Sequence, residues 1–203
     1  MGKDWSLLNI DWRKTLTLLA CFIAMLGLSI YIMRPSDAEL EARGGQPPAP
    51  VLNIPDERIA ITFDERVWVL AKELRQEGKY TAEYTPQGDS YPSWKERLTI
   101  QAFGGIQDKG TLEDFAAAVQ QHITEWAKDK VLWKVVAVSD NELLYEWQVV
   151  GKENFADQYE VCRIMKGAQG IHLVHYTTRQ LPIDAAQRDI WLKKLLSARL
   201  QMP

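Results

Sequence analysis

The sequence contains few of the residues that form disulfides or bind metals. Its 203 residues include two cysteines, Cys21 and Cys162, and three histidines. Cys21 lies in an apolar segment and Cys162 in the folded part, so no internal disulfide is expected. His172 and His175 are three residues apart on a predicted strand and should point to opposite faces, where they cannot bind one ion. The sequence therefore predicts no metal site.

Known catalytic and cofactor motifs are also missing from the sequence. It has no Gly-x-Ser-x-Gly elbow, no Walker loop and no dinucleotide fingerprint. Acidic pairs such as Glu113-Asp114 are explained by helix capping. Acidic residues outnumber basic ones by 27 to 24, which argues against binding of nucleic acid. We expect a protein that is not an enzyme, with no catalytic residues and no cofactor.

Charge is absent from one long segment, Thr15–Met33, which Lys14 and Arg34 bracket. At ~1.5 Å per residue this segment would extend about 28 Å, close to the thickness of the bilayer core. It predicts a transmembrane helix, and the basic residues before it predict a cytoplasmic N-terminus. Leu18–Cys21 resembles a lipobox, so lipidation of Cys21 stays open as an alternative.

Composition divides the chain into four parts. Residues 1–14 form an amphipathic cytoplasmic tail, and residues 15–33 the transmembrane helix. Residues 34–56 form a linker rich in proline and glycine, which favours extended backbone. Residues 57–203 are predicted to form one soluble α+β domain.

Within this domain the sequence predicts a mostly antiparallel sheet packed with two helices, an α+β fold. Alternating apolar residues or β-forming residues predict these strands: Ile59–Phe63, Val67–Lys72, Lys79–Tyr84, Arg97–Phe103, Val131–Val138, Leu143–Val150, Gln158–Met165 and Ile171–Thr177. Of these, Val67–Lys72 could instead open a short helix. Hairpins are expected at Asn141 and at Lys166–Gly170.

Two helices follow from helical spacing of apolar residues. Thr111 caps the first, and its buried stripe is Leu112, Phe115, Ala116, Val119, Ile123 and Trp126. Asp184 caps the second, with Gln187 as its capping-box partner, and the stripe is Trp191, Leu192, Leu195 and Ala198. We expect Trp191 to face the same interior as Trp147 on the sheet.

The stretch Glu83–Gln101, EYTPQGDSYPSWKERLTIQ, resembles a pattern of uncharacterised single-pass bacterial envelope proteins. The order of helices and strands resembles the PsbP-type α-β-α sandwich. The resemblance supplies no catalytic residues. PsbP-like proteins are often accessory or assembly factors of membrane complexes, and the resemblance implies the same kind of role here.

Two groups of residues are candidate partner contacts. A stripe of small residues on the predicted transmembrane helix would let another helix approach closely, and aromatic residues around a loop rich in proline and glycine would contact a partner protein. These residues are Ala20, Ala24, Gly27 and Tyr31 in the first group and Tyr84, Tyr91 and Trp94 in the second. Tyr84 and Trp94 could instead fill one end of the sandwich.

The predicted function is that of a non-enzymatic, membrane-anchored accessory or assembly subunit of a bacterial inner-membrane protein complex. Its partners would be the membrane and other membrane-protein subunits, and its C-terminal domain would bind in the periplasm. The alternative is an independent envelope module that binds a small ligand in the sandwich.

Overall fold

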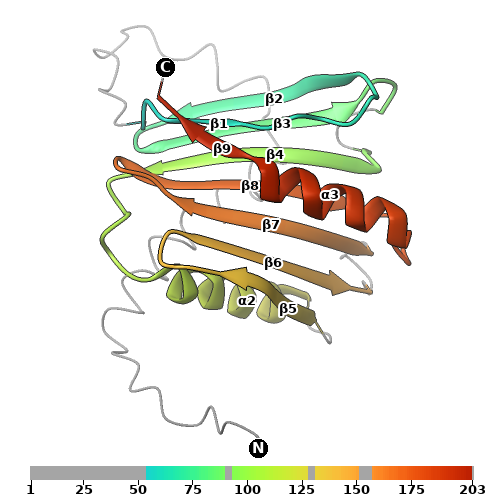
Figure 1. The fold of residues 1–203 in the computed structure, drawn as a ribbon. Coiled ribbons are helices and arrows are strands. Elements are labelled where there is room, and N and C mark those ends of the chain that lie inside the picture. The colour runs from blue at the N-terminus through green and yellow to red at the C-terminus, as the bar shows by residue number, and fades with distance from the viewer. Residues whose placement is uncertain (1–53, 90–92, 128–130, 151–156, 203) are drawn as a thin grey trace, which may run out of the picture.

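A seven-stranded antiparallel sheet organises the molecule (Figure 1). The computed structural model describes residues 54–89, 93–127, 131–150 and 157–202. The strand order is β2-β3-β4-β8-β7-β6-β5. The strands are β2 (Trp68–Gln76), β3 (Lys79–Pro86), β4 (Glu96–Gly104), β5 (Leu132–Val138), β6 (Glu142–Val149), β7 (Gln158–Lys166) and β8 (Gly170–Thr178).

Short hairpins join neighbouring strands and set their register. Gly78 has a φ of 68° in the turn between β2 and β3, a backbone conformation that glycine adopts without a steric penalty. The predicted hairpins around Asn141 and at Lys166–Gly170 are confirmed, since β5 pairs with β6 and β7 pairs with β8. Val67–Lys72 contributes to β2, which is a strand and not a helix.

Each face of the sheet has its own apolar core and its own helix. Helix α2 (Leu112–Ala127) packs on one face against β6, and α3 (Ala185–Ser197) packs on the other against β7 and β8. Alternation along β7 divides its side chains between the two cores: Cys162 and Ile164 lie in the α2 core, and Val161 and Met165 lie in the α3 core. We refer below to the α2 face and the α3 face.

Both helices begin where the sequence predicts. Thr111 Oγ1 accepts a hydrogen bond from the Asp114 N–H at 3.1 Å, and Asp114 Oδ2 accepts from the Thr111 N–H at 3.0 Å. Asp184 caps α3 by accepting from the Gln187 N–H. The Gln187 side chain does not complete a capping box, because it donates to Glu96 and to Tyr176.

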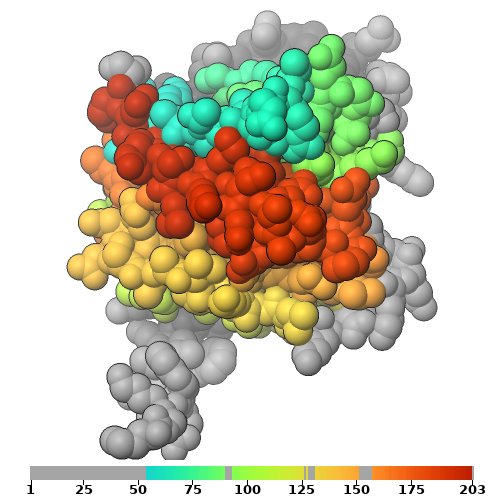
Figure 2. Space-filling model, turned by 45° about the vertical axis from the view of Figure 1, so that its right-hand side comes forward, coloured from blue at the N-terminus to red at the C-terminus, as the bar shows by residue number. Residues whose placement is uncertain are grey.

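A second, two-stranded sheet lies on the α3 face. It pairs β1 (Arg58–Ala60) with β9 (Arg199–Gln201), which follows α3 directly. Figure 2 shows α3 and β9 as a red band across this face, between the cyan segment that contains β1 and β2 and the yellow segment of β5 and β6. The last residues of the domain are thus tied to its first strand.

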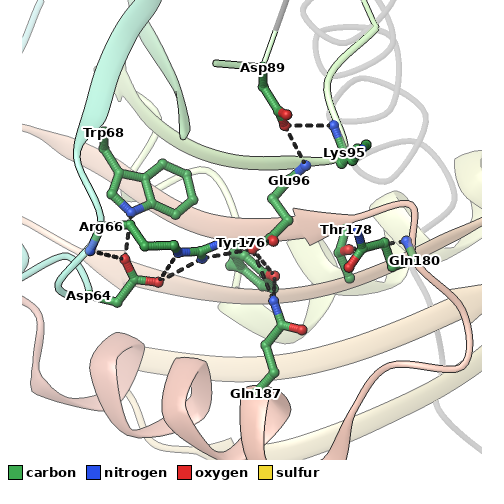
Figure 3. A network of polar contacts seen from close by, with 10 residues as sticks. All are labelled: Asp64, Arg66, Trp68, Asp89, Lys95, Glu96, Tyr176, Thr178, Gln180 and Gln187. Carbon is green, nitrogen blue, oxygen red and sulfur yellow. Dashed lines mark hydrogen bonds and ion pairs between the residues drawn. The ribbon is translucent and has the colours of Figure 1, made fainter. Parts of the chain in front are cut away.

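A polar network attaches α3 and the loop before β2 to the main sheet (Figure 3). Arg66 donates to both carboxylate oxygens of Glu96 at 2.8 Å and to Asp64 at 2.6 Å. Glu96 Oε2 also accepts from the Tyr176 hydroxyl at 2.7 Å and from Gln187 Nε2 at 2.9 Å. Glu96 of β4 therefore joins the loop before β2, strand β8 and helix α3. Charge-assisted hydrogen bonds such as those from Arg66 are stronger than neutral ones.

Glu57 holds the β7–β8 hairpin against the start of the domain. Its buried carboxylate accepts from the N–H groups of Ala168 at 2.7 Å and Gln169 at 3.1 Å, and it lies 3.0 Å from His172 Nε2. A Cβ at Gly167 would overlap this carboxylate. Burial raises the pKa of Glu57, but the two backbone hydrogen bonds and His172 outweigh it and keep the net pKa below the usual value.

Replacing His172 with glutamine is expected to flatten the dependence of stability on pH below pH 6.5. Burial lowers the pKa of folded His172 below 6.5, so the unfolded chain binds this proton first as the pH falls. Stability is therefore lost below about pH 6.5, by up to about 1.4 kcal/mol per pH unit. Glutamine does not titrate and can still donate to Glu57. Urea unfolding at several pH values between 7 and 5 measures the slope, and equal slopes for both proteins would contradict the assignment.

The predicted α+β class is wrong in its balance, because the fold is β-rich. The strands of the main sheet hold about twice as many of the described residues as α2 and α3, which are the helices that these residues contain. Hairpin turns return the chain directly into the next strand, so helical segments are confined to two places. Strand β9 was not predicted. The predicted strand Ile59–Phe63 is shorter in the structure, where β1 covers Arg58–Ala60.

The transmembrane part of the predicted fold is also corrected. No helix among the described residues is long and apolar enough to cross a bilayer. The segment that motivated the prediction, Thr15–Met33, lies outside those residues, as do the tail and most of the linker.

The expectation that Trp147 and Trp191 share one interior is wrong. Trp147 lies in the core on the α2 face, and Trp191 lies in the core on the α3 face. Both are buried. The alternation of β6 shows which of its residues share a face, but it does not show which helix covers that face.

Candidate functional site

Buried polar side chains gather on the α2 face of the sheet. Strand pairing places them on neighbouring positions of β3, β4, β7 and β8. We name this group the polar patch: Thr81, Glu83, Arg97, Thr99, Gln101, Glu160, His175 and Thr177. Arg97 and His175 are partly exposed, and the other members are buried. Buried polar groups carry a free-energy cost unless they have partners, so each contact in the patch is informative.

Several atoms of the patch lack a hydrogen bond. Among the described residues, six buried side-chain nitrogen or oxygen atoms have no such partner. Three of them, Arg97 Nε, Thr99 Oγ1 and His175 Nδ1, belong to the polar patch, and a fourth is Arg179 Nε beside it. This concentration marks the patch as the part of the sheet with the most unused binding capacity.

Trp94 lies between two arginines at one end of the patch. The guanidinium carbons of Arg97 and Arg179 lie 4.3 Å and 4.0 Å from the centre of its indole ring. Arg97 also faces Glu83, at 3.5 Å. Burial, followed by the nearby charge of Arg97, lowers the pKa of Arg179. The indole is thus enclosed by cation–π contacts and is 4% exposed.

Glu160 is the most connected carboxylate of the patch. It accepts from Thr177 Oγ1 at 3.0 Å and from Trp147 Nε1 at 3.2 Å, and its Oε1 lies 3.3 Å from His175 Nδ1. Burial raises the pKa of Glu160, but His175, with help from Thr177 and Arg97, lowers it below the usual value. Glu160 is therefore held as an anion inside the sheet layer.

Cys162 lies beside this carboxylate. Its side chain is fully buried, and burial raises the pKa of its thiol well above the usual value. Glu160, Cys162 and His175 each place one ligand atom within 4.8 Å of the other two. Among the described residues, this is the group whose side chains could hold a metal ion.

The α3 face carries a pocket of about 460 Å³ beside β1. Ile61, Phe63, Tyr84 and Ile100 give it an apolar wall, and Ser197 and Arg199 add polar groups. An apolar wall with one cation at its side suits an anionic amphiphile.

The edge strand β5 exposes apolar side chains. Leu132, Val135, Val136 and Val138 are between 36% and 53% exposed, and β5 ends the order of the main sheet. Its register against β6 shifts between Val135 and Ala137. Exposed edge strands are templates for pairing with another chain.

The structure does not bring the predicted partner contacts together. Tyr84 lies on the α3 face, 5.3 Å from Phe63 between ring centres, and lines the pocket. Trp94 is enclosed at the patch on the α2 face. The remaining candidates, Tyr91 and the four residues Ala20, Ala24, Gly27 and Tyr31, lie outside the described residues, as does the side chain of Trp126.

Sequence reasoning placed His172 and His175 correctly on opposite faces but missed the neighbours of His175. His172 contacts Glu57, whereas His175 faces Glu160 and lies opposite Cys162 in the strand pairing. The Glu-x-Cys spacing on one predicted strand was a signal in the sequence. The third residue of the group, His175, could not be found in this way, because its position depends on the register of the β7–β8 hairpin.

Comparison with known proteins yields a match to a protein-family model over residues 52–201. The match covers the described domain from its first strand to its last. It provides no link to the PsbP type, and no curated protein matches the chain.

Proposed function

The chain belongs to a bacterial protein family whose model matches residues 52–201, and from this premise we propose a binding role for its domain. The domain would be a non-enzymatic accessory or assembly subunit of a bacterial inner-membrane protein complex, and it would bind a partner subunit in the periplasm. We also propose that the domain is related to the bacterial envelope proteins that the stretch Glu83–Gln101 resembles. The partner would be a protein with an extended segment.

The exposed apolar edge β5 carries this proposal. A strand at the edge of a sheet has a row of backbone N–H and C=O groups with no strand to pair with, and natural proteins commonly protect such edges with charge or proline. Strand β5 reads LWKVVAV, with Lys134 as its one charged residue. Lys134 lies 3.6 Å from Glu146 on the next strand, so it is partly neutralised.

The addition of a partner strand would use the backbone groups of β5 and its exposed apolar side chains. The backbone of a partner segment would hydrogen-bond to β5, and its side chains would cover the exposed Leu132, Val135 and Val138. Trp133 anchors β5 to the core, because its ring stacks on Tyr145 with 4.3 Å between ring centres. The edge is therefore held in position before a partner arrives, which lowers the entropic cost of binding.

Replacing Val136 with lysine is expected to reduce partner binding by about tenfold, which corresponds to ~1.4 kcal/mol. The added charge would be buried by an incoming strand. To measure binding, a photo-crosslinking residue replaces Lys134 in the full chain. After irradiation in the bacterial envelope, the yield of the adduct with one identified partner subunit is compared with and without the Val136 change.

The matched control is Ile190→Lys, the same kind of change at a 47% exposed position on α3. Both variants should keep the stability of the domain to within about 0.5 kcal/mol. Equal adduct yields for the two variants would contradict binding through β5. The pocket of about 460 Å³ on the α3 face would then favour the second candidate, an envelope module that binds an anionic amphiphile.

A further inference from the structure

Three possible metal ligands from two strands meet at one point of the polar patch. Glu160 and Cys162 are two residues apart on β7, so they project from the same face. His175 lies opposite Cys162 in the pairing of β7 with β8. Their ligand atoms lie within 4.8 Å of one another, so small rotations of the side chains would bring all three onto a single ion.

The orientation of His175 favours a shared ion between its ring and Glu160. Its Nε2 lies 3.1 Å from Gln101 Oε1, an oxygen that can only accept a hydrogen bond. This contact places a proton on Nε2. Gln101 is oriented in turn by its own 3.4 Å contact with Thr81. Such an outer contact is how proteins usually fix the ring of a metal-binding histidine.

His175 Nδ1 then lies beside Glu160 without a hydrogen bond. It lies 3.3 Å from Glu160 Oε1, yet it is one of the buried atoms with no hydrogen-bonding partner. A proton on Nδ1 would offset the carboxylate charge, but its N–H direction would miss the oxygen. A metal ion placed between the two atoms would satisfy both.

Neighbouring side chains hold Glu160 in place, and Cys162 is buried beside it. Thr177 and Trp147 donate to Glu160 and orient its carboxylate. Cys162 is fully buried, whereas the His175 side chain keeps 15% exposure. An ion would therefore enter from the side of His175.

We propose that Glu160, Cys162 and His175 bind one zinc ion through a carboxylate oxygen, Sγ and Nδ1. Carboxylate, thiolate and imidazole are all ligands of Zn²⁺, and three protein ligands leave a fourth position for water. Binding replaces the thiol proton of Cys162, which leaves to solvent. The thiolate and the carboxylate together balance the two charges of the ion. This site goes beyond the proposed binding function and does not depend on it.

Cobalt titration of the metal-free full chain tests the site. Co²⁺ takes the place of Zn²⁺, and a cobalt–thiolate bond gives an absorption band that oxygen and nitrogen ligands do not give. The titration uses a Cys21→Ser background, so that Cys162 is the only thiol. The expected result is one Co²⁺ per chain, with the thiolate band, partial quenching of the tryptophan fluorescence, and displacement by Zn²⁺.

Two ligand variants and one control test the site. Cys162→Ser should abolish the thiolate band, and Glu160→Gln should weaken Co²⁺ binding at least tenfold while keeping partners for Thr177 and Trp147. The control, His172→Gln, changes the histidine on the opposite face and should leave the titration unchanged. Circular dichroism reports whether each variant is folded, and Glu160→Gln tests the site if Cys162→Ser fails to fold. Failure of the metal-free chain to bind Co²⁺, or equal affinity in Glu160→Gln and the control, would overturn the proposal.

Discussion

Replacing Trp191 with alanine is expected to lower the free energy of unfolding by about 3–5 kcal/mol. The indole is fully buried on α3. It stacks on Tyr176, with 4.3 Å between ring centres and 10° between planes, and its edge meets Trp68 at 5.5 Å. Alanine would leave a cavity between helix and sheet that these rigid rings cannot fill. Chemical denaturation followed by circular dichroism measures the change.

Ile190→Ala provides the comparison for Trp191. Ile190 precedes Trp191 on the same helix but is 47% exposed, so its removal should cost far less. A loss of less than about 1 kcal/mol for Trp191→Ala would show that the α3 face can repack without this side chain.

A loss of about 1–3 kcal/mol is expected for Arg163→Ala, because the change removes a buried donor to three carbonyl oxygens. Arg163 lies buried on β7, and its Nη1 donates to the carbonyl oxygens of Leu195, Leu196 and Ala198 at 2.6–2.9 Å. The last carbonyls of a helix have no partners within it, so Arg163 satisfies the end of α3. Alanine would remove this donor and leave longer contacts: Leu195 O would keep the Ala198 N–H at 3.2 Å, and Arg199 Nη1 would remain 3.4 Å from Leu196 O and 3.2 Å from Ala198 O.

A change at Glu142 distinguishes the hydrogen bonds of Arg163 at the end of α3 from its ion pair. Arg163 Nη2 lies 2.8 Å from Glu142, whose side chain is 52% exposed. Ion pairs that reach solvent contribute about 0–1 kcal/mol. Glu142→Gln should therefore change the unfolding free energy by less than ~1 kcal/mol. Equal losses for Arg163→Ala and Glu142→Gln would contradict the role assigned to the carbonyl contacts.

Local pattern predicted the elements of this fold better than their assembly. The alternation in Leu143–Val150 and the capping at Thr111 act over a few residues, and both appear where expected. Strand β9 has three residues after a helix, too few to show alternation. It forms because β1 offers it a partner, which no local pattern can reveal.

The candidate sites depended on contacts between distant segments. Tyr84 and Trp94 are ten residues apart, yet they lie on opposite faces. Their aromatic character predicted burial or contact but could not separate the faces. Glu160 and His175 meet only because the β7–β8 hairpin has one particular register. A shift of one residue would have placed His175 on the other face.

The pairing of β1 with β9 brings the two ends of the domain to one corner. Arg58 lies opposite Gln201 in this pairing, so a short peptide could connect the ends without crossing the sheet. New ends could then be opened in the turn at Gly78, between two strands that would stay neighbours. A circularly permuted chain should therefore reach the same fold. Any protein fused after β9 would also lie close to the start of β1, because Arg58 is opposite Gln201.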